Sequence, residues 1–141
     1  FSATSSPLNW TPAILYALLP LWVGDSLGIF VGKGLGKHPM APGVSPKKTW
    51  EGGIANFLGC VGMGLGWSLL RHDPIWIGIT CGLIAGTFGQ LGDLMQSALK
   101  RKADLKDSGS LLPGHGGILD RLDSMLMTAC PIAIIAILNA R

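Results

Sequence analysis

Four apolar stretches, each close to the length of a membrane-spanning helix, make up most of this chain. They cover residues 11–31, 52–70, 75–93 and 118–140 of 141. A helix needs about 20 apolar residues to cross the hydrocarbon core of a bilayer, and backbone polar groups in lipid must be bonded within the protein. The sequence therefore predicts an all-α polytopic membrane protein with about four transmembrane helices.

Composition agrees with a bilayer setting. Hydrophobic residues make up 48% and charged residues 13% of the chain, and the mean hydropathy is +0.45, which is too apolar for an ordinary soluble domain. Small residues four apart let helix backbones approach closely in lipid, which predicts a compact helical bundle. Such glycine pairs are Gly28/Gly32, Gly62/Gly66, Gly78/Gly82 and Gly82/Gly86.

Basic residues gather in two connections between the apolar stretches, residues 32–51 and 96–117. Lys and Arg mark the cytoplasmic side of membrane proteins, so both polar loops are expected to face the cytoplasm. The net charge of +3 belongs mainly to these loops and indicates attraction for phosphate and lipid headgroups, with no nucleic-acid partner. For Lys37 and Lys102 the simple role of a topology signal or snorkelling anchor is preferred.

The densest charge lies between the last two apolar stretches, where residues 97–123 read SALKRKADLKDSGSLLPGHGGILDRLD. Polar groups are costly in or near hydrocarbon, so this run needs water, partners or metal. A ligand site is therefore predicted here. Within it, Asp120 and Asp123 would share one face of a helix that opens at Ile118. That spacing permits a metal site, and the structural alternative is an ion pair of Asp120 or Asp123 with Arg121 or Lys100.

Other acids lie in or at the end of an apolar stretch. Asp93 ends the third stretch, and Ser97 continues a polar stripe that begins at Gln90. Asp25 is flanked by apolar residues, where an ionisable side chain has a functional role by default. It could complete a metal shell, hold a lysine of the basic loop, or pack as a protonated or solvated residue.

A second polar motif, SPKKTWEG, occupies residues 45–52. Ser45 and Pro46 suit the cap and the first position of a helix, which would carry Lys47 and Lys48 onto a helix start at the membrane interface. Backbone amides at a helix start, together with lysines, suit an anion. The motif is thus a candidate phosphate contact.

The order of polar residues in 97–123 resembles the signature of the phosphatidate cytidylyltransferases, the CDP-diacylglycerol synthases. SPKKTWEG is again similar to this family, although Lys33 stands where many relatives have Arg. The resemblance implies a Mg²⁺-dependent nucleotidyltransferase of phospholipid biosynthesis, which transfers CMP from CTP to phosphatidate to give CDP-diacylglycerol and pyrophosphate. The signature positions are Ser97, Lys100, Arg101, Lys106, Asp107, Pro113, His115, Gly116, Gly117, Asp120, Arg121 and Asp123.

The resemblance also implies residue roles. The catalytic set would be Asp93, Asp120, Asp123, Lys106, His115 and Arg121, of which the three aspartates would hold Mg²⁺, with a second cation left open. The substrate-binding set would be Ser45, Lys47, Lys48, Ser97, Lys100, Arg101, Asp107, Gly116 and Gly117. Because the attacking phosphate oxygen is already largely ionised, His115 is expected to contact phosphate and not to serve as an obligatory base.

The resemblance covers most of this chain but about half of a typical family enzyme, because members carry additional amino-terminal transmembrane helices. Residues 1–141 are thus expected to form one membrane-embedded catalytic domain, the carboxyl-terminal part of a longer enzyme, with its active site facing the cytoplasm. CTP, phosphatidate and bilayer lipid are the expected partners, and a homodimer is left open. The alternatives are a CTP-dependent lipid or polyprenol kinase and a non-catalytic truncated membrane fragment.

Overall fold

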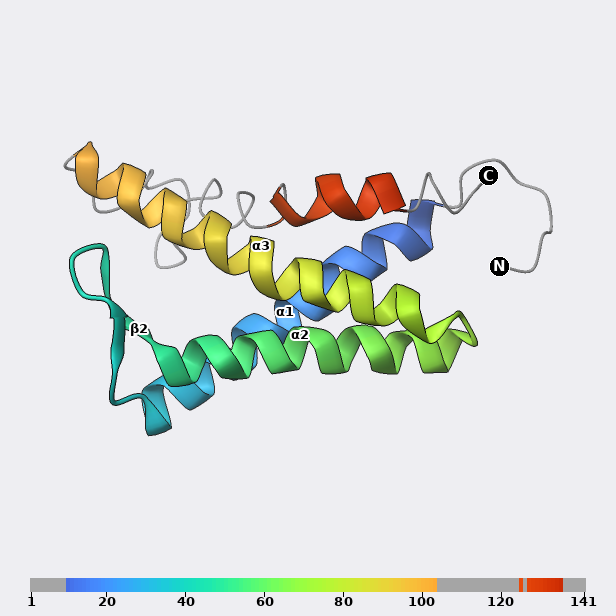
Figure 1. The fold of residues 1–141 in the computed structure, drawn as a ribbon, viewed down its shortest axis with the longest axis horizontal. Coiled ribbons are helices and arrows are strands. Elements are labelled where there is room, and N and C mark those ends of the chain that lie inside the picture. Colours follow the sequence, from blue (N-terminus) through green and yellow to red (C-terminus); the bar gives the residue numbers. More distant parts are fainter. Residues whose placement is uncertain (1–9, 104–124, 126, 136–141) are drawn as a thin grey trace, which may run out of the picture.

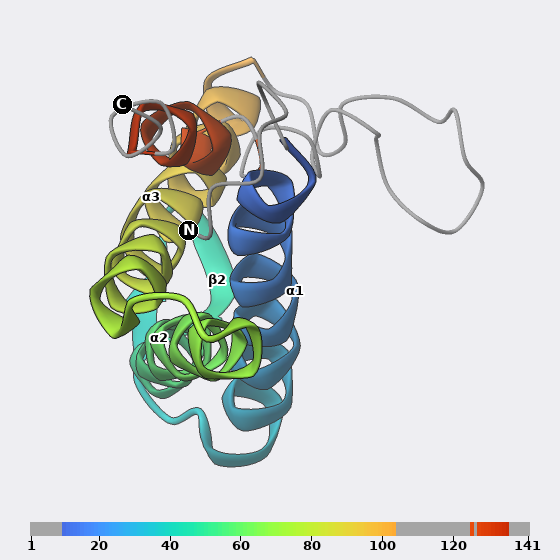
Figure 2. The ribbon, with the colours of Figure 1, turned by 90° about the vertical axis from the view of Figure 1, so that its right-hand side faces the viewer.

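The computed structural model describes residues 10–103, 125 and 127–135, and within them the fold is a bundle of long helices with one short hairpin (Figure 1). The elements in chain order are α1 (Trp10–Leu35), β1 (Pro39–Ala41), β2 (Ser45–Thr49), α2 (Trp50–Arg71) and α3 (Ile75–Lys102). Residues 125 and 127–135 are also helical. Viewed along the bundle (Figure 2), α2 lies on one side of α1 and α3, and this last segment lies on the other.

The three long helices are apolar enough to cross a membrane over Ile14–Leu35, Trp50–Arg71 and Ile75–Lys102. Large apolar side chains point outward from them: Phe30 is 77% exposed and Leu70 is 73% exposed. Lipid is the solvent that suits such a surface. The predicted all-α membrane architecture is confirmed. The described part of the fourth predicted stretch is helical, and the rest of that stretch lies outside the described residues.

Glycines bring α2 against both of its neighbours. A Cβ built on Gly28 of α1 would lie 3.1 Å from the carbonyl oxygen of Gly52, and one on Gly82 of α3 would lie 2.7 Å from the Cα of Val61. Both distances are shorter than side chains normally tolerate, so these helices touch backbone to backbone, as the glycine spacing predicted.

Not every predicted glycine contact forms. Around Gly62 and Gly66, a built Cβ meets no atom of the described residues within 4 Å. Within the described part of the chain, this pair therefore does not serve as a helix contact. Two other glycines of α2 make the close contacts instead: Gly59 packs against α1 and Gly64 packs against α3. A spacing of four predicts that two glycines share a face, but it does not say which face meets a neighbour.

The connection between α1 and α2 is an antiparallel hairpin of β1 and β2, which the sequence did not predict. Ser45 and Pro46 begin β2, so the expectation that they open a helix is wrong. Proline is tolerated there because each strand of a two-stranded sheet has an unpaired edge. The helix instead begins at Trp50, where the preceding Thr49 adopts an extended conformation and its hydroxyl accepts a hydrogen bond from the Gly52 amide at 3.3 Å.

Helix α3 runs further than its apolar stretch, to Lys102 instead of Asp93. Ser97, Lys100 and Arg101 therefore lie on a helix and not in the loop expected from residue 96 onward. The intervening residues are mostly good helix formers, so the loss of apolar character at Asp93 marks a change of surroundings and not the end of the helix.

At the end of the bundle remote from the hairpin, polar groups tie α1 to the short turn between α2 and α3. The Tyr16 hydroxyl lies 3.0 Å from the Ser68 Oγ and donates to the Asp73 Oδ2 at 2.9 Å. Arg71 holds the same carboxylate at 3.1 Å. Tyr16 is 4% and Ser68 is 0% exposed. Buried polar groups that are satisfied in this way fix the relative positions of the helices that carry them.

Candidate active site

A pocket of about 970 Å³ opens between the three helices and β2, at the end of the bundle that carries the hairpin. Apolar side chains such as Trp22, Ile29 and Met40 line part of it. Its polar and charged lining includes Asp25, Lys33, Lys47, Lys48, Asn56, Gln90 and Asp93. Cations, carboxylates and amides thus converge on one cavity, which is the usual composition of a site for a polar ligand.

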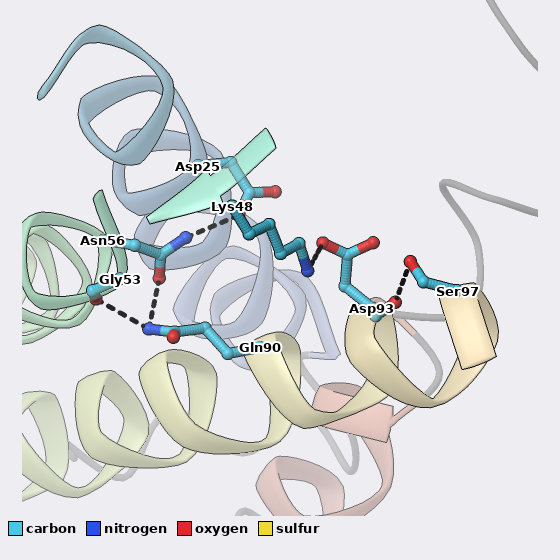
Figure 3. A network of polar contacts seen from close by, with 7 residues as sticks. All are labelled: Asp25, Lys48, Gly53, Asn56, Gln90, Asp93 and Ser97. Atoms are coloured by element: carbon cyan, nitrogen blue, oxygen red, sulfur yellow. Dashed lines mark hydrogen bonds and ion pairs between the residues drawn. The ribbon is translucent and has the colours of Figure 1, made fainter. Parts of the chain in front are cut away.

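Lys48 of β2 and Asp93 of α3 form an ion pair at this pocket (Figure 3). Their side chains are 27% and 47% exposed, so water reaches both groups. The backbone carbonyl of Asp93 also accepts a hydrogen bond from the Ser97 hydroxyl at 2.8 Å. The Lys48–Asp93 ion pair thus joins the hairpin to α3. It places Lys48 of the SPKKTWEG motif in contact with Asp93, the residue at which the apolar part of α3 ends.

A second polar group lines the same pocket, with one side chain from each long helix (Figure 3). The Asn56 Nδ2 donates to the Asp25 Oδ1 at 2.8 Å, and the Gln90 Nε2 donates to the Asn56 Oδ1 at 3.3 Å. The same Gln90 nitrogen donates to the Gly53 carbonyl at 2.9 Å. Polar side chains in a membrane bundle commonly satisfy one another across helices in this way.

The hairpin is fastened to the bundle at both of its ends. At its base, the His38 Nδ1 lies 2.7 Å from the Glu51 Oε1, and the Trp50 amide donates to the His38 carbonyl at 3.0 Å. At its tip, the Arg101 Nε donates to the Val44 carbonyl at 3.3 Å. These contacts hold β2 across the pocket, which determines where the two motif lysines can reach.

The structure brings together some of the predicted site residues. Lys47, Lys48 and Asp93 line the pocket, whereas Ser45, Ser97, Lys100 and Arg101 are not among its described lining residues. Asn56 was missed, although an amide inside an apolar stretch was a usable signal. The predicted residues that lie outside the described part of the chain are Lys106, Asp107, His115, Gly116, Gly117, Asp120, Arg121 and Asp123.

The donor atoms of the pocket suit a hard cation. Mg²⁺ prefers oxygen ligands and is usually held by one or two carboxylates, together with water and substrate phosphates. Asp25 and Asp93 supply carboxylates, and Asn56 adds an amide oxygen. Among the described residues, no group of three His, Cys, Asp or Glu side chains is close enough to hold a metal. The carboxylates of Asp25 and Asp93 therefore fit the number that usually holds Mg²⁺ beside substrate phosphates.

The structure thus places the lysines of a hairpin beside carboxylates at one end of an apolar helical bundle. The chain belongs to the cytidylyltransferase family, whose sequence model matches residues 3–138. It is 48% identical over 117 residues to a phosphatidate cytidylyltransferase of Bacillus subtilis (strain 168), an alignment that covers 80% of this chain and 43% of that protein. It is 45% identical over 116 residues to a phosphatidate cytidylyltransferase of Staphylococcus aureus (strain COL), with 80% and 44% covered. The chain thus spans less than half the length of these curated relatives.

Proposed function

We propose that this chain carries the nucleotide and phosphate site of a phosphatidate cytidylyltransferase, which forms CDP-diacylglycerol and pyrophosphate from CTP and phosphatidate. The observation that carries the proposal is the meeting of Lys47 and Lys48 with Asp93 at one pocket. Relatives of that name share 48% and 45% of the aligned residues with this chain. Bilayer lipid would surround the apolar helix faces and hold the acyl chains of the lipid substrate.

The reaction joins two anions, and this defines what the protein must supply. A phosphate oxygen of phosphatidate attacks the α-phosphorus of CTP, a new P–O bond forms, and the bond to pyrophosphate breaks. Catalysis of phosphoryl and nucleotidyl transfer is largely positioning and charge stabilisation. The hairpin lysines bring positive charge to the pocket. When phosphates enter, Lys48 can exchange the Asp93 carboxylate for a phosphate oxygen, which leaves Asp93 available to a cation.

Mg²⁺ is the proposed cofactor, and when bound it would neutralise charge on the nucleotide phosphates. Asp93, Asp120 and Asp123 are its proposed ligands, and a second cation remains part of the proposal. Lys106, His115, Arg121, Gly116 and Gly117 are proposed phosphate contacts from the segment outside the described residues, with Asp107 orienting one of the cations. Lys100 and Arg101, on the last turn of α3, are proposed to contact the nucleotide or the phosphatidate headgroup, with Ser45 and Ser97 nearby as polar contacts.

The hairpin end of the bundle is proposed to face the cytoplasm, which supplies CTP. The last turn of α1 carries Lys33, and the last turn of α3 carries Lys100, Arg101 and Lys102. At the opposite end, Arg71 and Asp73 balance each other. An excess of Lys and Arg at one end is the pattern of a cytoplasmic face.

The test uses two forms of the protein in membranes: the 141-residue chain alone, and a chimera in which this chain replaces the matching residues of the Bacillus subtilis relative. Each is supplied with phosphatidate, Mg²⁺ and CTP labelled either in the base or at the γ-phosphate. Label from the base in CDP-diacylglycerol supports the proposal. Label from the γ-phosphate in lipid would identify a kinase, and no labelled lipid from either form, beside an active parent relative, would refute an enzymatic site.

A further inference from the structure

Asp25 and Asn56 present a carboxylate and an amide side by side in the pocket. We propose that this pair reads the base of the nucleotide, accepting a hydrogen bond from the cytosine amino group and donating one to a cytosine acceptor, and so selects CTP over UTP. Gln90 acts as the positioning residue that orients the Asn56 amide. This inference rests on the proposed function and adds the specificity determinants of that same site.

The orientation of the Asn56 amide follows from its partners. The Gln90 Nε2 can only donate, so the Asn56 atom that faces it at 3.3 Å must be the oxygen. The Cys60 thiol lies 3.5 Å from the same oxygen. The Asn56 nitrogen is thereby turned toward Asp25, which accepts from it at 2.8 Å. A donor and an acceptor thus stand next to each other in a fixed order.

That order matches cytosine and opposes uracil. Cytosine offers an amino donor at N4 next to an acceptor at N3, whereas uracil has a carbonyl acceptor at the first position and an N–H donor at the second. A carboxylate has about four lone-pair positions, so Asp25 can keep its partners, Asn56 among them, and still receive the amino group. With uracil, its negative charge would face the O4 lone pairs. A site built to bond one polar edge rejects the analogue that lacks it, because its own groups are left unpaired.

The pocket offers partners to both parts of a nucleotide. Figure 3 shows the Lys48 side chain running from the neighbourhood of Asp25 to Asp93, and the Asp25–Asn56–Gln90 group and the Lys48–Asp93 pair line the same pocket. A nucleoside triphosphate has a polar, uncharged base and anionic phosphates, which amides with a carboxylate and lysines, respectively, can bond. Apolar side chains that include Trp22 and Met40 line the same pocket and can cover the faces of a base.

Two plainer roles compete with this one. Asp25 and Asn56 could serve only to hold α1 and α2 together, since polar side chains often link helices in membranes. Asp25 could also be a ligand of the proposed cation. Neither of these two roles would make the protein prefer CTP over UTP. A change in nucleotide preference on mutation is therefore expected only if Asp25 and Asn56 recognise the base.

The experiment compares CTP and UTP as substrates for the active form of the protein, as wild type, D25N, D25E and D73N. The expected result is that D25N lowers the ratio of kcat/KM for CTP to that for UTP by about 10- to 100-fold, the size of one lost base-reading contact. D25E keeps a carboxylate and should keep the preference. D73N makes the same change at the opposite end of the bundle and should leave the ratio unchanged.

A binding measurement covers the case in which D25N is inactive. Equilibrium dialysis of CTP and UTP against the solubilised variant gives the same ratio without turnover. A ratio within about twofold of wild type, in turnover or in binding, would overturn the inference. Equal losses with both nucleotides that excess Mg²⁺ restores would also overturn it, in favour of a metal ligand. Wild-type protein that forms no lipid nucleotide at all would instead refute the proposed function, which keeps the two failures apart.

Discussion

Replacing Lys48 with Ala should show how much the Lys48–Asp93 pair contributes to the reaction rate and how much it contributes to the stability of the fold. The two side chains are 27% and 47% exposed, so water screens the pair. Ion pairs this accessible contribute about 1 kcal/mol or less to stability. The K48A variant should therefore unfold within about 1 kcal/mol of wild type when heated in detergent.

Activity should respond far more strongly. If Lys48 transfers from Asp93 to a phosphate oxygen during the reaction, its loss removes a charge that stabilises the transition state. Removal of one such stabilising group typically costs about 10²- to 10³-fold in rate, or about 3–4 kcal/mol. The assay is CDP-diacylglycerol formation at saturating and limiting CTP. Lys37→Ala is the matched control, because Lys37 is exposed near the hairpin and is not among the described pocket residues.

A double-mutant cycle with Asp93→Asn sharpens the result. If Lys48 works only by holding Asp93 in place, the double variant should be no worse than D93N alone. If Lys48 binds phosphate and Asp93 binds the cation, each loss should add to the other. Near-normal turnover of K48A, or a loss of turnover that tracks a loss of folded protein, would refute the reasoning.

The remaining predictions concern helix packing at glycines, the Tyr16–Ser68–Asp73 hydrogen bonds and the proposed metal site. Gly82→Ala should destabilise the bundle by about 1–3 kcal/mol in thermal unfolding, since its Cβ would lie 2.7 Å from backbone atoms of α2, whereas Gly62→Ala should stay within about 0.5 kcal/mol. Tyr16→Phe should cost about 1–2 kcal/mol, because it removes the hydroxyl between two buried or half-buried partners, and should leave the CTP:UTP ratio unchanged. Asp120→Asn should abolish Mg²⁺-dependent turnover with normal membrane insertion; near-normal activity would give Asp120 a structural role.

The three long helices and most of their ends were predictable from the sequence, but α1 and α3 extend beyond the predicted stretches, to Leu35 and Lys102. Runs of apolar residues determine which segments can enter lipid, and the three described spans lie where those runs are. The run in α3 fades at Asp93, but the backbone hydrogen bonding continues to Lys102 because a helix can leave hydrocarbon and persist in a polar setting. Hydropathy indicates whether the surroundings of a helix are apolar. It locates the end of a helix only where the helix ends at the same residue as its apolar surroundings.

The hairpin, Asn56 and the meeting of Asn56 with Asp25 and Gln90 were missed for different reasons. Strands as short as Pro39–Ala41 leave almost no periodic signal, and their pairing depends on contacts with α2 and α3 that a local pattern does not contain. The Asp25–Asn56–Gln90 contacts form only when α1, α2 and α3 are each rotated about their own axes so that these side chains face one another. That rotation is set by which glycines meet, and the sequence offered more glycine pairs than the bundle uses.

The glycine contacts and the polar pocket are linked through the position of α2. Gly28 of α1 touches Gly52, one turn before Asn56, so the close approach of these backbones brings Asp25 within hydrogen-bonding distance of the Asn56 amide. A Cβ at Gly28 would lie 3.0 Å from the Asn56 Cβ, so a side chain there would press directly on the residue that bonds Asp25. The small residues thus do more than allow tight packing in lipid, because they set the spacing of the polar groups that line the pocket.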